Sequence, residues 1–270
     1  MYLIYIYIYE MDTLQERNID KHISVVIASC LINQGKFSCL INSINSIRTF
    51  SQNSEIIIGF DKTGPNDLQL KELSVYDNLS HFTHNRGLGY TFNHGNKLAK
   101  NDIILQTEDD WIIRNRYLTT PNEFKTLLFK ATQVLNKHDN SCVRLDGGMF
   151  DEIGGSNGYP LGWNKHRLTE TCKYYSYVLP TRTQMEENIW LHYAFCNHPH
   201  LKLKKITVNN PYPENVSPAI VENDYSVNWI LNKYNVFYVP INEESIKIRG
   251  CTNADKNIFC HIGYEYSYRK

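Results

Sequence analysis

The stretch that decides the fold runs from Asn85 to Trp111 and reads NRGLGYTFNHGNKLAKNDIILQTEDDW. Two glycines precede Tyr90–Lys100, which we expect to be a helix, and Asp102–Thr107 (DIILQT) is an apolar run typical of a buried strand. Three carboxylates, Glu108 to Asp110, follow that strand directly. A helix that leads into a buried strand with a polar end predicts one unit of an α/β sheet.

The same alternation of strands and helices occupies the chain upstream. His22–Ser29, Glu55–Phe60 and Leu79–Thr83 are expected to be strands, the first two as buried, β-branched runs. Phe37–Phe50 carries apolar residues at the spacing of a helix face, and Pro65–Tyr76 is a short helix opened by proline. Such connections require a mostly parallel central sheet flanked by helices, so the sequence predicts an α/β, Rossmann-like architecture.

The chain beyond Trp111 has a less regular pattern. The further helices and strands that we expect are Glu123–His138, Arg182–Phe195 and Ile220–Tyr234, and Ser141–Asp146, Tyr174–Leu179 and Val236–Val239. Gly147–Gly162 is rich in glycine and predicts a long loop. Pro199–Pro218 contains four prolines and is expected to be irregular, and the residues beyond Val239 are expected to be mostly loop.

Charge and cysteine content exclude several classes of protein. The chain has 28 basic and 28 acidic residues and no basic stripe, so binding to nucleic acid is not expected. A short cluster at Lys202, Lys204 and Lys205 is interpreted as a solvated face. The seven cysteines are scattered and form no C-x-x-C pair, which argues against a zinc site or a disulfide framework and favours reduced thiols in a cytosol-like compartment.

The N-terminus carries an unusual run, Tyr2–Tyr9, that reads YLIYIYIY. It is shorter than the ~20 apolar residues that cross a bilayer, and it lacks the basic region and cleavage site of a signal peptide. We therefore expect a soluble, cytoplasmic protein without a transmembrane segment. The run is either a strand or the product of tandem TA dinucleotides in an AT-rich genome, and in the second case the functional start is Met11.

Polar residues end the expected strands, which is where ligands bind in parallel sheets. They include Ser29 after Ala28, Asp61, and the triplet Glu108 to Asp110. Three adjacent carboxylates repel one another and resist burial, and a divalent cation offsets that repulsion. Carboxylate oxygens are hard ligands, which suit Mg²⁺ or Mn²⁺. The alternative for the triplet is an exposed acidic turn. Asp61 is suited equally to bonding a base or ribose and to forming a turn.

The segment with two glycines suggests a second candidate site. Gly87 and Gly89 allow a ligand to approach the backbone closely, Arg86 could meet phosphate, and Asn93 follows on the helix. The spacing is not the dinucleotide fingerprint, because the third glycine is out of place. A tight turn with close helix packing explains the same residues without a ligand.

Further candidates lie toward the C-terminus. Glu222 and Asp224 lie near the start of the helix Ile220–Tyr234, where one of them would be a general base that deprotonates an acceptor hydroxyl. Acidic residues at a helix N-terminus are also favoured by the helix dipole alone. His261 could complete the coordination sphere of a metal, or be a packed or surface residue.

Four segments in this order resemble the family 2 inverting glycosyltransferases, which have the GT-A fold. ISVVIAS at Ile23–Ser29 resembles the first strand of that family, and Asn85–Trp111 resembles its region from the third strand to the aspartate motif. Val221–Pro240 (VENDYSVNWILNKYNVFYVP) resembles its acidic catalytic helix and the following strand, and CHIG at Cys260–Gly263 its late histidine. The resemblance covers Ile23–Gly263, nearly the whole chain.

The resemblance implies a role for most of the candidates. The residues expected to bind the donor are Ala28, Ser29, Asp61 and Asp109, joined from the glycine segment by Arg86, Gly87 and Asn93. The residues expected at a Mn²⁺ or Mg²⁺ ion are Asp110, with Glu108 and His261 as further ligands. The expected base is Asp224, with Glu222 as the competing candidate.

Two departures from the family pattern bear on these roles. The D-x-D-like motif begins with Glu108, which is one methylene longer than aspartate, so its share in the metal site is open. The acidic helix has Glu-Asn-Asp at Glu222–Asp224 where family members often have adjacent Glu and Asp, which leaves the base open between the two. A second pair, Glu186 and Glu187, on an earlier expected helix competes for the same role.

The predicted function is a metal-dependent, inverting glycosyltransferase that moves a sugar from a nucleotide-sugar donor to a hydroxyl of a glycan, protein or small-molecule acceptor. Two alternatives stay open: a nucleotidyltransferase acting on sugar phosphates, and a non-catalytic carbohydrate-binding protein on a decayed transferase fold. We expect an extension (1–22), one domain (23–263) and a tail (264–270). The domain would divide into a donor half (23–114) and an acceptor and base half (115–263). A homo-oligomer also stays open.

Overall fold

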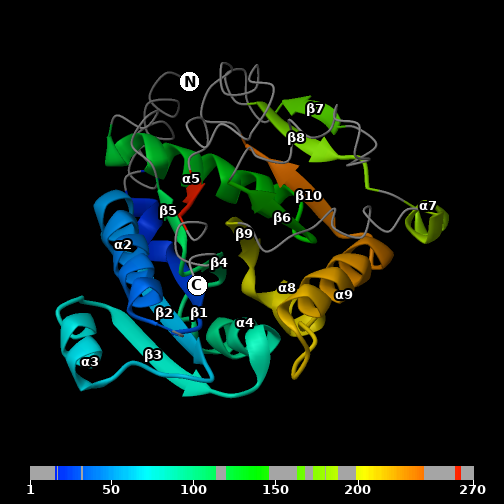
Figure 1. Ribbon diagram of the computed structural model, residues 1–270. Coiled ribbons are helices and arrows are strands. Elements are labelled where there is room, and N and C mark those ends of the chain that lie inside the picture. Colours follow the sequence, from blue (N-terminus) through cyan, green and yellow to red (C-terminus); the bar gives the residue numbers. More distant parts are fainter. Residues whose placement is uncertain are drawn as a thin grey trace, which may run out of the picture.

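The computed structural model describes residues 16, 18–31, 33–113, 120–145, 163–167, 173–179, 181–187, 199–239 and 259–262. Their centre is a nine-stranded sheet in the order β3-β2-β1-β4-β9-β6-β10-β8-β7 (Figure 1). No helix in this part of the chain is long and apolar enough to cross a membrane. The run Tyr2–Tyr9, Met11, the loop expected at Gly147–Gly162, the second half of the helix Arg182–Phe195 and the tail 264–270 lie outside the described residues.

The first half of the chain forms the predicted parallel unit. Its strands are β1 (Ile23–Ser29), β2 (Glu55–Asp61), β3 (Leu79–His84) and β4 (Ile103–Glu108), and its helices are α2 (Gln34–Phe50), α3 (Asp67–Leu73) and α4 (Gly87–Leu98). A short 3₁₀ helix, η1 (Ile19–His22), precedes β1. β2 and β4 flank β1 and β3 extends the sheet, with every pairing parallel. The α/β prediction for this half is therefore confirmed.

The second half continues the same sheet in a mixed arrangement. Its strands are β6 (Ser141–Arg144), β7 (Trp163–Arg167), β8 (Lys173–Tyr177), β9 (His200–Leu203) and β10 (Asn235–Tyr238), and its helices are α5 (Pro121–Lys137), α7 (Arg182–Glu187), α8 (Lys204–Asn209) and α9 (Pro218–Leu231). β10 runs parallel to β6, whereas β9 is antiparallel to both β4 and β6, and β8 is antiparallel to β7 and β10. The parallel pattern thus holds for the first four strands and for β6 with β10.

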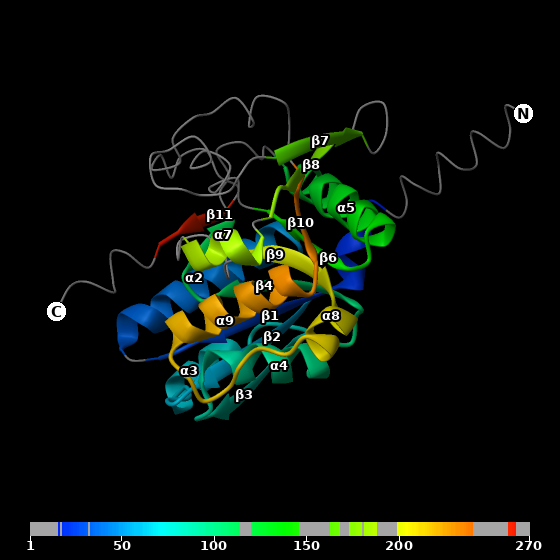
Figure 2. The ribbon, with the colours of Figure 1, turned by 90° about the vertical axis from the view of Figure 1, so that its right-hand side faces the viewer.

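Alternate residues of the buried strands supply two apolar layers. Val25 and Ile27 of β1 belong to the layer formed with α2 and α5, and Val26 belongs to the layer formed with α4, α8 and α9. Figures 1 and 2 show these two groups of helices on opposite faces of the sheet. A strand buried on both faces has no polar side, which is why β1 is apolar along almost its whole length.

The expectation of an irregular segment at Pro199–Pro218 is wrong for its first part. Residues 200–209 form β9 and α8, and β9 lies in the middle of the sheet between β4 and β6. The interpretation of the lysine cluster as a solvated face is also wrong for Lys202, which is 0% exposed, although Lys205 is exposed. Four residues, HLKL, are too few to reveal a period, and the lysine conceals that the strand is buried.

A second, two-stranded sheet pairs β5 (Trp111–Ile113) with β11 (Phe259–His261) in antiparallel orientation. The expectation of mostly loop beyond Val239 misses β11, because three residues carry no usable pattern. The pairing sets His261 opposite Trp111, and the backbone N–H of Ile262 donates a hydrogen bond to the carbonyl of Asp110 at 2.7 Å. The C-terminal strand therefore lies directly beside the acidic triplet.

Candidate functional site

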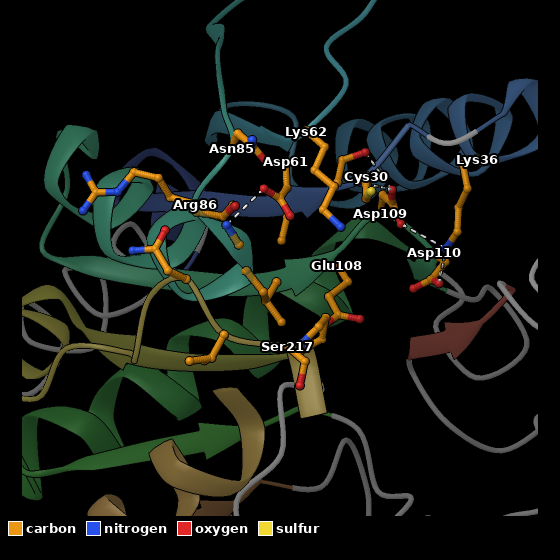
Figure 3. A pocket seen from close by; sticks show the side chains of 18 residues that line it. Cys30, Lys36, Asp61, Lys62, Asn85, Arg86, Glu108, Asp109, Asp110 and Ser217 are labelled. Atoms are coloured by element: carbon orange, nitrogen blue, oxygen red, sulfur yellow. Dashed lines mark hydrogen bonds and ion pairs between the residues drawn. The ribbon is translucent and has the colours of Figure 1, made fainter. Parts of the chain in front are cut away.

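A pocket of about 660 Å³ opens at the carboxyl ends of β1, β2 and β4, beside the start of α4 (Figure 3). The chain runs from β1 outward to β2 and β3 and then places β4 on the other side of β1, so the pocket lies at a topological switch point of the sheet. Its lining residues are Ala28, Ser29, Cys30, Lys36, Asp61, Lys62, Asn85, Arg86, Gly87, Leu88, Thr91, Glu108, Asp109, Asp110, Asn215, Val216, Ser217 and Pro218.

Asp109 joins the ends of β1 and β4 across the switch point. Its carboxylate Oδ2 accepts a hydrogen bond from Ser29 Oγ at 2.7 Å and from the N–H of Cys30 at 3.4 Å. Its backbone N–H donates to the carbonyl of Ala28 at 3.0 Å. Burial, the largest influence, raises the pKa of Asp109, Lys36 lowers it, and the balance lies at about 6. The sequence singles out Ala28, Ser29 and Asp109 separately, and the structure brings them into contact.

Lys36 is the cation that faces the two aspartates, and the sequence argument did not find it. Its Nζ lies 2.9 Å from Asp110 Oδ2 and 3.6 Å from Asp109 Oδ1. It belongs to the first turn of α2, where Asn33 Oδ1 accepts a hydrogen bond from its backbone N–H at 2.9 Å. Burial lowers the pKa of Lys36, but the two carboxylates outweigh burial and the pKa is raised above its ordinary value.

Asp61 fixes the entry to α4 as well as lining the pocket. Its Oδ1 accepts a hydrogen bond from the N–H of Gly87 at 3.0 Å and lies 3.5 Å from His84 Nδ1. The following residue, Lys62, has φ of 67°, the left-handed region, so the chain turns sharply at the end of β2. Burial lowers the pKa of His84 even though Asp61 opposes this effect. Asp61 therefore lies at a turn and also lines the pocket, and its contact with a base or ribose stays a prediction.

The close approach that the glycines permit is made by the protein's own chain. A Cβ added at Gly89 would lie 1.8 Å from the carbonyl oxygen of Pro213, and one added at Gly87 would lie 3.2 Å from that of Val216. Gly87 also has φ of 78°, which favours glycine. The segment 212–218, called here the pocket wall, therefore packs on the start of α4, and its last four residues line the pocket.

Asn93 and Arg86 hold the pocket wall in place. The Asn93 side-chain amide donates to the Tyr212 carbonyl and to Glu214 Oε1, each at 2.9 Å, and its oxygen accepts from the Tyr212 N–H at 2.9 Å. Arg86 bonds Glu214 Oε2 at 2.5 Å and stacks on the ring of Tyr90, 4.1 Å from its centroid. Asn93 is buried and is not among the lining residues, whereas Arg86 is.

The other candidates are placed less directly at the pocket. Glu222 and Asp224 lie on α9, and neither is among the residues that line the pocket, although Ser217 and Pro218 at the start of that helix are. Asp224 is exposed, and Asn223 Nδ2 donates to its Oδ1 at 3.3 Å. For His261 the structure describes the backbone, beside the triplet, and not the side chain.

Comparison with known proteins defines the fold. No protein-family model and no curated protein matches the chain. The crystal structure of S. aureus TarS 1–349 matches with a TM-score of 0.50 and 13% identity, over 80% of this chain and 57% of that one. The fold is of the GT-A type.

Two more TarS structures match with lower TM-scores. S. aureus TarS 1–349 in complex with UDP matches with a TM-score of 0.49 and 16% identity, over 59% of that chain. A longer S. aureus TarS chain matches with a TM-score of 0.47 and 16% identity, over 36% of that chain. Each match covers 80% of this chain. The chain thus spans less than two thirds of every TarS chain named here. Identities at this level establish the shared architecture alone.

The acidic pair has the chemistry of a partial site for a divalent cation. Asp109 Oδ1 and Asp110 Oδ2 already converge on one positive charge, the Lys36 ammonium, and carboxylate oxygens suit Mg²⁺ and Mn²⁺. Within the described ranges no group of three or more His, Cys, Asp or Glu side chains is arranged to hold a metal. Water and substrate phosphate commonly complete the coordination of such ions. The residues therefore fit a cation that a substrate shares, provided that Lys36 gives way.

The lining residues that the sequence did not point to include Lys36, Lys62 and residues 215–218. Lys36 follows β1 by seven residues, and a lysine in the first turn of a helix at a switch point would have been a sufficient reason to consider it. The pocket wall gave no signal of this kind, because its role depends on tertiary packing against α4.

Proposed function

We propose that this chain is a metal-dependent glycosyltransferase that takes a sugar from a nucleotide-sugar donor and transfers it, with inversion, to an acceptor hydroxyl. The observation that carries the proposal is the buried pair Asp109 and Asp110 facing a pocket at the switch point of a GT-A-type sheet. Ligands bind at switch points in such sheets. The resemblance to family 2 inverting enzymes belongs to the same proposal.

In this proposal the donor lies along the carboxyl ends of β1, β2 and β4. Ala28, Ser29 and Asp61 would contact the base and ribose, since their polar atoms border the pocket on the side of β1 and β2. Lys62 lines the same region and offers an ammonium beside the start of α4, where the Gly87 N–H is already bonded to Asp61. Helix starts of this kind favour anionic groups.

Asp110, with Asp109 and Glu108, would hold Mn²⁺ or Mg²⁺. When bound, such an ion supplies Lewis-acid neutralisation of the diphosphate leaving group. The residues of the chain have complementary tasks: Ser29 holds the Asp109 carboxylate in place, and Lys36 shields the pair while no divalent charge is present. His261 is proposed as a further ligand, because β11 places it opposite Trp111 and next to the triplet.

Inversion requires a base that takes the proton of the acceptor hydroxyl as its oxygen attacks the anomeric carbon. We propose Asp224 for this role, with Glu222 and Glu187 as the competing carboxylates. α9 begins at the pocket wall, and Glu222 and Asp224 lie in its first two turns. The acceptor is a glycan, a protein or a small molecule. We also propose a reducing, cytoplasmic setting, since Cys30, Cys39 and Cys142 form no disulfide.

The deciding experiment incubates the full chain with a panel of nucleotide sugars and either Mn²⁺, Mg²⁺ or EDTA. A glycosyltransferase releases nucleoside diphosphate in the presence of the cation, and Asp110→Asn should lower the release at least ~100-fold. Release of pyrophosphate from a nucleoside triphosphate and a sugar phosphate would instead indicate a nucleotidyltransferase. Binding of sugar in a thermal-shift assay, without release of either product from any donor, would favour a non-catalytic carbohydrate-binding protein.

A further inference from the structure

The position of Lys36 connects the two sides of the switch point. The lysine belongs to the helix that follows β1, whereas its carboxylate partners follow β4 on the neighbouring strand. Figure 3 shows its side chain extending to Asp110 and Asp109. Only 15% of the side chain is exposed, and the carboxylates of Asp109 and Asp110 are 6% and 9% exposed. The contact is therefore shielded from solvent, which strengthens it.

The other cations that line the pocket have different partners or positions. Arg86 is paired with Glu214 on the pocket wall, and in Figure 3 its guanidinium extends away from the aspartates. Lys62 follows β2, and the described residues show no ion pair between it and either aspartate. Lys36 is thus the lining cation that is in direct contact with both aspartates.

The same carboxylate oxygens cannot serve the ammonium and a divalent cation together. Asp110 Oδ2 accepts a hydrogen bond from Lys36 Nζ at 2.9 Å. A divalent cation bound to the same oxygen would lie close to the ammonium, and the two positive charges would repel each other strongly. Lys36 would have to release this oxygen before the pair could bind Mn²⁺ or Mg²⁺. The side chain is long and carried by a helix start, so it can swing away without unfolding α2.

We propose that Lys36 is a tethered counter-ion that competes with the divalent cation for Asp109 and Asp110. It neutralises the pair while the pocket holds no divalent charge, and it releases the pair when the cation binds. On release its ammonium still borders the pocket, where it can bond an anionic group of a donor. The competition concerns the cation that the proposed function invokes, and it rests on that proposal.

The test measures Mn²⁺ binding to the full chain without any donor, by electron paramagnetic resonance of free Mn²⁺. Lys36→Met keeps the aliphatic stem and removes the competitor, so it should tighten Mn²⁺ binding at least about tenfold, the value of one charge-assisted hydrogen bond. Lys36→Arg keeps the charge and should stay near the wild type. Lys62→Met is the matched control, because it removes one charge from the same pocket without a partner among the aspartates, and it should change affinity less than about threefold.

The direction of the change separates this role from a structural one. A lysine that only supports the fold would, when removed, weaken Mn²⁺ binding or leave it unchanged, and either result overturns the proposal. So does equal tightening in Lys36→Met and Lys62→Met, or no binding in any variant. Should Lys36→Met fail to fold, acetylation of the wild-type chain followed by mass spectrometry gives the answer: Mn²⁺ should increase the labelling of Lys36, and protection or no change would contradict the competition.

The absence of donor from this experiment keeps its outcome separate from that of the proposed function. A chain that shows the competition but turns over no nucleotide sugar would refute the transferase proposal alone. A chain that releases nucleoside diphosphate with Mn²⁺, yet shows no tightening in Lys36→Met, would refute the competition alone.

Discussion

Replacing Lys202 by methionine should stabilise the protein in a way that depends on pH. Lys202 lies in β9 at the centre of the sheet and is 0% exposed. Its Nζ donates to Tyr212 Oη at 3.0 Å and lies 4.6 Å from the ring centroid of Tyr212 and 5.4 Å from that of Tyr225. The described residues offer it no carboxylate partner. Burial lowers the pKa of Lys202 to about 7.

The magnitude follows from the difference between this pKa and the ordinary value of 10.5 in the unfolded chain. Between these values the unfolded state binds one proton more than the folded state, so the free energy of unfolding rises with pH. Between about pH 7.5 and 9.5 the free energy of unfolding of the wild type should therefore increase by about 2.5 kcal/mol, which corresponds to roughly 5–10 °C in Tm. The ring faces of Tyr212 and Tyr225 favour the charged form, so this is an upper value. Methionine has the same unbranched shape and carries no proton, so this increase should be missing from Lys202→Met.

The assay is urea unfolding of wild type and Lys202→Met at several pH values from about 7.5 to 9.5. Other groups titrate in both proteins, so the difference between the two carries the information. We expect the variant to be the more stable at the lower pH and its advantage to shrink as pH rises. A difference that stays constant across this range would show that Lys202 keeps its ordinary protonation in the fold, and it would refute the reasoning.

Further predictions concern the pocket. Asp110→Asn and Asp224→Asn should each lower nucleoside diphosphate release at least ~100-fold with an unchanged circular dichroism spectrum; near-normal release in Asp110→Asn would remove its metal role. Gly89→Ala directs a Cβ at the Pro213 carbonyl and should cost about 2–3 kcal/mol in urea unfolding, whereas a loss below about 0.5 kcal/mol would contradict the packing. Ser29→Ala breaks a buried bond to a carboxylate and should cost about 2 kcal/mol by the same assay; an unchanged midpoint would argue against that bond.

The first half of the fold could be predicted because three of its strands, β1, β2 and β4, are buried along most of their length. Ile56, Ile57 and Ile58 of β2 are all 0% exposed, and such a short, β-branched run is typical of a strand buried on both faces. The polar residues at the strand ends then followed from topology, which brings Ser29, Asp61 and Asp109 to one edge of the sheet. The sequence could not reveal that Lys36 would meet the aspartates, because Lys36 and Asp110 are 74 positions apart and the residues between them carry no signal of the contact.

The second half was harder because its decisive elements are short or chemically misleading. β9 has four residues, and β5 and β11 have three each, below the length at which alternation can be recognised. Lys202 looks like a surface residue, and its burial depends on two tyrosines, one of which is 23 residues away. The sequence left open whether the glycines at the start of α4 admit a ligand or allow tight packing, and part of the space they create is filled by Pro213.

The pocket wall shows why the two halves of the chain form a single site. Tyr212 precedes the lining residues 215–218 and is held by contacts from four elements. Asn93 of α4 bonds its backbone, and its ring stacks on Tyr225 of α9. Its hydroxyl accepts hydrogen bonds from Gln106 of β4 at 2.7 Å and from Lys202 of β9 at 3.0 Å. Two central strands, β4 and β9, and two helices, α4 and α9, therefore set the position of the wall. Because Asn93 acts through this tyrosine, its replacement by alanine would be felt at the pocket through displacement of residues 215–218 rather than through loss of a ligand contact.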